Sequence, residues 1–471
     1  MRKYFLLTFF FFQTMHLFAQ HQELTEAPDM YKENKSADSK SLLHAFKSGS
    51  VNGHFRYFFM STDNQNNLTD YYANAAGGGL RFETAKFHGF QFAVSGFYTF
   101  NLGSSDFTKP DSTTNQFNRY ESALFDIEQP ENKVDLDRLE EFYIRYNLKK
   151  SKIVLGRQLI NTPFINLQDG RMRPTGVNGV WININDFKKI KIEGGWITAI
   201  APRGTMRWFN PGASIGVYSS GVNIDGSKSD YHNNLKSEGV ALMGMHYSIK
   251  QKLKFQFWDM YVSQIFNTEM IQFDWSHQLK DSTVIFAALQ GIHQVAIKDG
   301  GNADPTKTYF NKGQQSFTFG GKIGWKNKQL EASINYNRIT SNGRYLVPRE
   351  WGREPFFTFM PRERNEGIGN ADAFVAKVNY NFFHSNIKTS IAFGYYHLPD
   401  VKNYKLNKYG MPSYTQLNAD VRYVFSGALK GFDTQLLLVG KLNQGNTYEN
   451  NKYVINKVNL IQYNFLLNYH F

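Results

Sequence analysis

Apolar side chains occupy every second position at the end of the chain, from Ile461 to Phe471, and most of the intervening side chains are polar. One face of this segment holds only apolar or aromatic side chains, and its last residue is a Phe. Successive side chains of a β-strand point to opposite faces, so the pattern predicts a strand with one face in an apolar medium. Such a strand would aggregate in water, whereas a bilayer accommodates its apolar face.

The same period of two recurs from Val51 onward and gives about eighteen candidate strands. In the segment 315–325, Phe317, Phe319 and Ile323 share one face, whereas Ser316 and Lys322 lie on the other. These faces match lipid outside and water inside, and the aromatic C-terminus looks like the terminal signal of outer-membrane β-barrels. The strands of a soluble β-sandwich also alternate between apolar and polar residues, but that fold does not explain the large number of Phe and Tyr on the apolar faces. The sequence therefore predicts an all-β, closed antiparallel transmembrane barrel.

The connections between the candidate strands alternate in length. Short turns are expected at 85–89, 149–151, 185–188, 249–251, 277–282, 326–328, 383–386 and 427–430. Long polar connections are expected at 61–70, 101–138, 159–176, 201–237, 298–313, 341–370, 399–414 and 443–456. In outer-membrane barrels the short turns are periplasmic and the long loops extracellular. The short connection at 263–268 breaks the alternation and leaves the count at sixteen to eighteen strands.

The N-terminus has the features of a secretory signal. Arg2 and Lys3 precede an apolar run that ends at Ala19, and this run is too short to span a bilayer core. We expect a signal peptide at 1–19, a flexible periplasmic leader at 20–49 with a short amphipathic piece at 41–47, and the barrel at 50–471. The leader is too short for the plug domain of a large transporter.

Composition agrees with this class. The mean hydropathy is -0.47, as in a soluble protein, because a barrel shows lipid only every second side chain. The 42 Phe and 27 Tyr suit aromatic belts at the membrane interfaces, and the absence of Cys excludes disulfides and thiolate metal sites. The net charge falls from +13 to +11 without Arg2 and Lys3. For a secreted barrel this excess favours lipopolysaccharide and anionic solutes as partners, and no motif supports nucleic acid.

The polar faces of the strands predict a basic lumen. Assigned inward are Arg56, Arg81, Arg145, Lys189, Lys191, Lys254, Lys322, Lys377, Lys388, Arg422 and Lys441. Inward carboxylates are fewer, with Glu83, Glu141, Glu193, Asp274, Glu331 and Asp420 as the main ones. An excess of positive charge lowers the barrier for anions in a narrow pore. Alternatively, each base neutralises a carboxylate on a neighbouring strand.

Two loops carry the charges and apolar side chains expected of a constriction. The third long loop holds Asp169, Arg171 and Arg173 between Pro163 and Pro174. The loop at 341–370 holds Trp351, Arg353, Glu354 and a Phe cluster at 356–359. Aromatic residues interleaved with charges predict loops packed against the wall that narrow the bore. A rigid surface loop held by ion pairs is the alternative.

Several of these segments resemble the OprD-type family of substrate-specific outer-membrane porins. They are 153–158 (IVLGRQ), 161–163 (NTP), 196–204 (WITAIAPRG) and 351–356 (WGREPF). The resemblance implies an eighteen-stranded barrel with a narrow eyelet, a ladder of wall bases and opposing acidic groups, passing small carboxylates. The ladder candidates are Arg145, Arg157, Lys191, Arg422 and Lys441, and Asp169 with Arg171 forms the candidate opposing pair. The strong charge of the loop at 341–370 departs from the family.

The sequence thus predicts an outer-membrane porin that passes small anionic or zwitterionic solutes by passive diffusion, as a monomer or homotrimer. Its expected pore-lining residues are Arg56, Arg81, Arg145, Arg157, Asp169, Arg171, Arg173, Lys191, Arg353, Glu354, Arg422 and Lys441. No catalytic residue, cofactor or metal site is expected, since the His residues are scattered and no Gly-x-Ser-x-Gly elbow occurs. The alternative is an adhesive or lipase-like barrel with a blocked bore.

Overall fold

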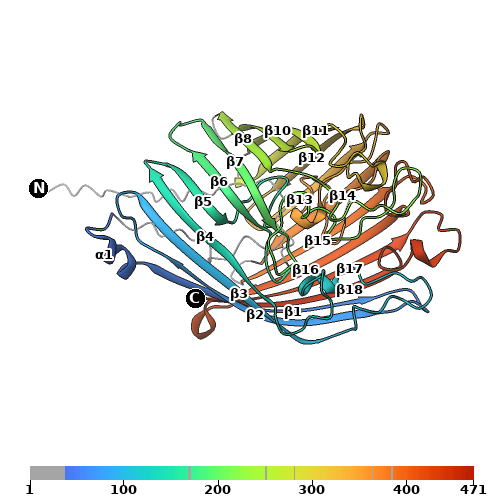
Figure 1. Ribbon diagram of the computed structural model, residues 1–471, viewed down its shortest axis with the longest axis horizontal. Helices are drawn as coiled ribbons and strands as arrows, with labels where there is room; N and C mark the ends of the chain where they lie inside the picture. Colours follow the sequence, from blue (N-terminus) through green and yellow to red (C-terminus); the bar gives the residue numbers. More distant parts are fainter. Residues whose placement is uncertain (1–37, 168–170, 250–251, 280–281, 364, 383–385) are drawn as a thin grey trace, which may run out of the picture.

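Eighteen antiparallel strands form a closed barrel in the computed structural model, which describes residues 38–471 except 168–170, 250–251, 280–281, 364 and 383–385 (Figure 1). The strands are β1 (Ser50–Asp63), β2 (Tyr71–Glu83), β3 (Phe90–Ser104), β4 (Asp137–Leu148), β5 (Ser151–Gln158), β6 (Gly176–Ile184), β7 (Ile190–Ala201), β8 (Val240–Ile249), β9 (Leu253–Val262), β10 (Phe266–Gln278), β11 (Val284–Ala296), β12 (Gln315–Lys326), β13 (Leu330–Ile339), β14 (Ala371–Asn381), β15 (Ile387–His397), β16 (Tyr414–Val424), β17 (Phe432–Asn443) and β18 (Leu460–His470). A single helical turn of α-type, α1 (Leu42–Lys47), precedes them. The predicted signal peptide lies outside the described residues.

The barrel closes through its first and last strands. Each strand pairs with the next in sequence, and β18 pairs with β1 in a register that places His54 opposite His470. The backbones of Gly53 and Phe471 exchange two hydrogen bonds of 3.0 Å. Closure leaves the sheet without an unpaired edge, which a barrel in lipid requires.

The two faces of the wall follow the predicted alternation. In β18, Ile461, Tyr463 and Phe465 are exposed on the outside, whereas Gln462 and Asn464 are buried on the inside. The strand count of eighteen is therefore correct, and the short connection at 263–265 between β9 and β10 is a true feature. Within the part of the chain that the structure describes, no helix is long and apolar enough to cross a membrane.

The connections divide between the two ends of the barrel as the sequence predicts. Helix α1 and the C-terminus lie at the end with the short turns (Figure 1). The opposite end carries nine connections. They are loop 1 (64–70), loop 2 (105–136), loop 3 (159–175), loop 4 (202–239), loop 5 (263–265), loop 6 (297–314), loop 7 (340–370), loop 8 (398–413) and loop 9 (444–459). We refer to these ends as periplasmic and extracellular.

Candidate constriction site

Loop 7 lies inside the barrel and follows the inner wall. The carbonyl of Pro355 accepts a hydrogen bond from Gln290 on β11, and those of Phe357 and Phe359 accept from Lys377 on β14, at 3.1, 2.9 and 2.8 Å. Further along, the carbonyl of Pro361 accepts from Gln416 on β16 at 2.7 Å. A loop has unpaired backbone groups, and inward polar side chains of the wall satisfy these. This is why lumen-facing polar residues hold the loop in place.

The tip of loop 7 ends at the strands that close the barrel. The Arg362 guanidinium donates to Gln462 and Asn464 on β18 at 2.5 and 2.6 Å. Lys441 on β17 donates its ammonium to the carbonyl of Arg362 at 2.7 Å. Loop 7 thereby spans the inner face from β11 to β18 and places the Arg362 guanidinium beside β18, one of the two strands that close the barrel.

Loop 3 is hydrogen-bonded to loop 7, mainly through the side chain of Asn166. The Asn166 amide donates to the carbonyl of Arg353 at 2.9 Å and accepts from its backbone N–H at 3.0 Å. Thr175 adds a hydrogen bond of 2.9 Å to the carbonyl of Glu350. The two loops that the sequence singles out are therefore joined to one another inside the barrel.

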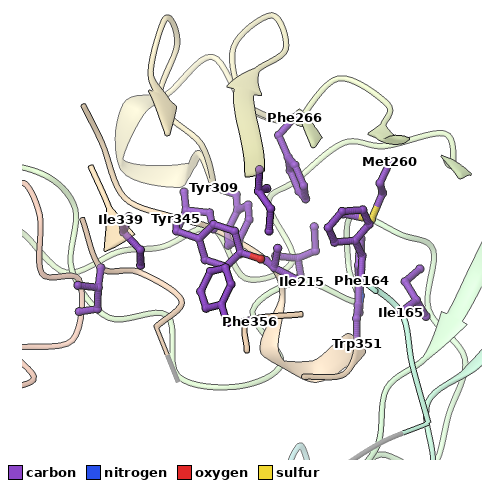
Figure 2. Close-up of a cluster of buried hydrophobic side chains, with 14 of the residues drawn as sticks. Phe164, Ile165, Ile215, Met260, Phe266, Tyr309, Ile339, Tyr345, Trp351 and Phe356 are labelled. Atoms are coloured by element: carbon purple, nitrogen blue, oxygen red, sulfur yellow. The ribbon is translucent and has the colours of Figure 1, made fainter. Parts of the chain in front are cut away.

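An apolar cluster supports this junction. Figure 2 shows Phe164 of loop 3 near Trp351 of loop 7, with Ile215 of loop 4 and Tyr309 of loop 6 in the same cluster. Trp351 is fully buried and donates its indole N–H to Ser214 at 2.9 Å. Burial of so much aromatic surface favours one packed arrangement of the loops. It explains the aromatic residues of loop 7, which a solvated surface loop does not require.

A buried ion cluster ties four loops together at the extracellular end. Glu366 of loop 7 contacts Lys408 of loop 8 at 3.0 Å and Arg349 at 3.4 Å, and it accepts from Tyr409 at 2.7 Å. Tyr309 of loop 6 also donates to Glu366 at 3.3 Å. The Tyr231 hydroxyl of loop 4 accepts from Lys408 at 2.9 Å. We call these residues the loop lock.

The charges of the loop lock perturb one another. Burial raises the pKa of Glu366, but the positive charges of Lys408 and Arg349 outweigh it, so this pKa is lowered. Burial lowers the pKa of Lys408 to about 8 although Glu366 opposes the shift. Both groups are consequently ionised at neutral pH, as a buried pair requires if neither charge is to be left alone.

Barrel closure gathers five of the eleven predicted wall bases. Arg422 lies on β16, Lys441 on β17, Arg56 on β1, Arg81 on β2 and Arg145 on β4, all on the inner face. Because β18 pairs with β1, these strands form one continuous arc of the wall. We call the five residues the basic arc. Sequence separation conceals this arrangement, since Arg56 and Arg422 come from opposite ends of the chain.

Carboxylates partner the bases at the periplasmic end of the basic arc. Arg81 contacts Glu141 at 2.9 Å and Glu83 at 3.3 Å, and Arg145 contacts Glu83 at 2.7 Å. The Tyr143 hydroxyl donates to Glu83 at 2.9 Å. All of these side chains are buried. Here the alternative expectation is correct, because the bases neutralise carboxylates across neighbouring strands.

Two other bases of the arc bond backbone carbonyls of the inward loops. Arg56 donates to the carbonyl of Arg171 in loop 3 at 2.6 Å and to Asn468 at 2.8 Å. Lys441 bonds the loop 7 backbone in the contact described above. Arg422 lies near the periplasmic end of β16, 3.9 Å from Asp420, and is partly exposed. Arg56 and Lys441 thus hold loops 3 and 7 against this segment of the wall.

The remaining candidates are dispersed. Arg353 lies over the Phe359 ring at 5.2 Å, and Glu354 accepts the backbone N–H groups of Asn365 and Glu366 at 2.7 Å each. Both line a cavity of about 40 Å³ with Lys322 and Lys377. Lys191 faces inward on β7, exposed near the periplasmic mouth and away from the basic arc.

Of the charged residues predicted in loop 3, the structure describes Arg171 and Arg173. Arg173 is buried, with its guanidinium 2.5 Å from the Met206 sulfur, and burial together with Arg138 lowers its pKa to about 9. Asp169 lies outside the described residues, so its predicted pairing with Arg171 stays a prediction. Buried Glu121 of loop 2, which sequence reasoning missed, accepts from Thr62 on β1.

The prediction for Arg157 is wrong. It pairs in register with Phe142, whose exposed side chain faces lipid, so Arg157 points out of the barrel. Its guanidinium lies 4.8 Å from the Trp208 ring. The sequence misled because Val154, on the inner face, is as apolar as Ile153 and Leu155 on the outer face. Without alternation the face of the strand cannot be assigned.

A closed eighteen-stranded barrel with loops joined across its interior defines an outer-membrane channel protein of the porin class. A family model described as "outer membrane porin, OprD family" matches residues 46–435. The chain therefore belongs to the OprD family of outer-membrane porins. No curated protein matches the sequence.

Solved structures show the same fold at low sequence identity. OccK9 (OpdG) of Pseudomonas aeruginosa is 13% identical with a TM-score of 0.71, and the match covers 90% of this chain and 99% of that one. OpdK of the same organism, in a structure with vanillate, is 11% identical with a TM-score of 0.69 over 90% and 99%. OccAB4 of Acinetobacter baumannii is 15% identical with a TM-score of 0.68 over 90% and 98%.

Proposed function

We propose that this porin passes small anionic or zwitterionic solutes bearing a carboxylate, by passive diffusion along the basic arc. The observation that carries the proposal is the gathering of three bases on the strands that close the barrel and on the tip of loop 7, where Arg56 and Lys441 donate to carbonyls and Arg362 donates to amides. Guanidinium and ammonium groups concentrated on one side of a bore lower the barrier for anions. An approaching carboxylate therefore meets a positive wall before it reaches the balanced cluster around Arg81.

Charged and aromatic groups beside loop 7 form a second set that a passing solute would meet at the wall, since the enclosed space of about 40 Å³ between them holds only a few water molecules. Lys322 lies 4.8 Å from the Phe357 ring, and Glu331 and Glu354 line the same space. Ammonium and carboxylate groups on facing sides orient a zwitterion, and aromatic rings accept an apolar body. The similarity to OpdK concerns the fold, and its vanillate belongs to that structure. Vanillate is nonetheless a fitting first probe, since it combines a ring with a carboxylate.

Reversal potential in a planar bilayer tests the proposal. Under a tenfold KCl gradient an ideally selective pore reverses near 59 mV in magnitude, and we expect the sign that marks anion preference. Arg422→Gln should reduce this preference, because Arg422 lies on the inner wall and is partly exposed. Arg157→Gln removes a base from the outer face and is the matched control, expected to leave the potential unchanged.

Addition of vanillate to one side should then reduce the single-channel current, and less so in Arg422→Gln. Cation preference in the wild type, or equal potentials for Arg422→Gln and the wild type, would overturn the anionic proposal. If correctly folded protein showed no conductance, the proposal that the barrel is an open channel would be refuted. It would favour the adhesive or lipase-like alternative.

A further inference from the structure

Helix α1 carries exposed apolar side chains at the periplasmic rim. Leu42, Leu43 and Phe46 are 57%, 66% and 45% exposed, whereas Ala45 is buried. At 100° per residue these three side chains occupy one arc of the helix, and His44 lies on another. A soluble segment with this pattern would hide its apolar side, so the exposed arc requires an occupant.

The helix is fixed to the rim by its neighbours. The carbonyl of Ala45 accepts from the backbone N–H of Ala85 in the β2–β3 turn at 3.0 Å, and Ser39 donates to the carbonyl of Lys86 at 2.7 Å. Asp38 accepts from the N–H of Gly89 at 3.1 Å. The Ser41 hydroxyl caps the helix by accepting from His44 at 3.2 Å. These bonds determine where the apolar arc faces.

The arc continues the lipid-facing surface of the barrel. The Phe46 ring stacks on Phe82 at 6.1 Å between centroids. Phe82 pairs in register with Val51, which is exposed on the outer face. The outer face around the helix is apolar as well, since Leu80 on β2 and Phe90 on β3 are exposed. The apolar arc of α1 is thus contiguous with an interface already assigned to lipid.

Basic side chains border the apolar arc. Lys40 and Lys47 are exposed at the two ends of the helix, and Lys86 lies in the turn against which it packs. Ammonium groups beside an apolar face match the boundary between acyl chains and phosphate groups. We propose that α1 lies in the phospholipid headgroup region of the periplasmic leaflet, with Leu42, Leu43 and Phe46 inserted among acyl chains.

A spin label on α1 tests this placement directly. The sequence has no Cys, so Leu43→Cys provides a single labelling site without other changes. His44→Cys, on the other side of the helix, is the matched control. The labelled barrels are placed singly in nanodiscs of phosphatidylethanolamine and phosphatidylglycerol. Collisions of the nitroxide with oxygen, which concentrates in lipid, and with a water-soluble nickel chelate are then compared.

Insertion predicts that the label at position 43 collides more with oxygen and less with the chelate than the label at position 44. Equal exposure of both labels to the chelate would overturn the proposal. Protection at position 43 that occurs only in crowded vesicles, and not in single-barrel nanodiscs, would assign the arc to a second copy and also overturn it. Leu42→Cys provides a second site on the arc, and each variant is first checked for folding by its heat-modifiable mobility in gels.

Discussion

Glu366→Gln should release the loops from one another without unfolding the barrel. Glu366 is buried with Lys408 and Arg349, and removal of one member of a buried ion pair costs about 3–5 kcal/mol. The lower end applies here. The pKa of Lys408 is already lowered to about 8, so without Glu366 its amine can lose the proton and limit the penalty. Gln also retains one acceptor for Tyr409.

A loss of about 3 kcal/mol raises the population of open loops by about 10²-fold, because each 1.4 kcal/mol is a factor of ten. Proteolysis of loops 6, 7 and 8 in the reconstituted barrel measures this population when opening is faster than cleavage. We expect the cleavage rate to rise by about that factor, while the strands stay protected. Lys312→Gln is the control, since its ion pair with Asp299 in loop 6 is exposed.

A double-mutant cycle separates the interaction between Glu366 and Lys408 from the effects of changing each residue alone. In Glu366→Gln with Lys408→Met, the second change removes the charge that the first leaves buried, so the combined effect should be smaller than the sum. Cleavage rates for Glu366→Gln within twofold of the wild type would refute the reasoning. Such a result would mean that the apolar cluster around Trp351 alone holds the loops.

The remaining predictions concern acid and the wall. The pKa of Glu366 is lowered from its ordinary value of 4.5, so the contribution of this carboxylate to loop packing is complete above pH 4.5 and is lost as the pH falls through the lowered pKa. Proteolysis of the loops should therefore accelerate in acid. The proteolysis rate of Glu366→Gln should not depend on pH in this range. Gly156 has φ +122°, and an added Cβ would lie 2.3 Å from the carbonyl oxygen of Phe142. Gly156→Ala should therefore reduce the yield of folded barrel, measured by heat-modifiable mobility, whereas Gly440→Ala, with open space around the new Cβ, should not. Equal yields would show that the β4–β5 pair absorbs the methyl group.

Alternation was sufficient to predict the wall where both faces have a distinct character. In β18 every second residue from Ile461 is apolar and faces lipid, and the intervening amides of Gln462 and Asn464 face inward. The same logic placed Arg56, Arg81, Arg145, Arg422 and Lys441 on the inner face. It failed at Arg157, because β5 has apolar residues on both faces and period two then carries no information about direction.

Aromatic residues interleaved with charges indicated which loops enter the barrel, but the contact partners of these loops could not be identified without the fold. Asn166 gives no sign in sequence that it pairs with the backbone of Arg353, which lies 187 residues away. Glu366 and Lys408 likewise come from different loops and meet only when these are packed. A charged loop residue is compatible with a solvated tip or with a buried ion pair, and burial decides between the two.

The sequence by itself determined the class of protein and the inward face of most strands, because a period of two is a local property of the chain, and it narrowed the strand count to sixteen to eighteen. The tertiary structure decided which inward residues meet. Pairing of β18 with β1 turns bases at opposite ends of the sequence into one arc, and the registers then select which of them meet a carboxylate. Barrel closure joins strands that are far apart in the sequence. The arrangement of charges that a solute meets in the bore therefore depends on strand pairing, which a local sequence pattern does not reveal.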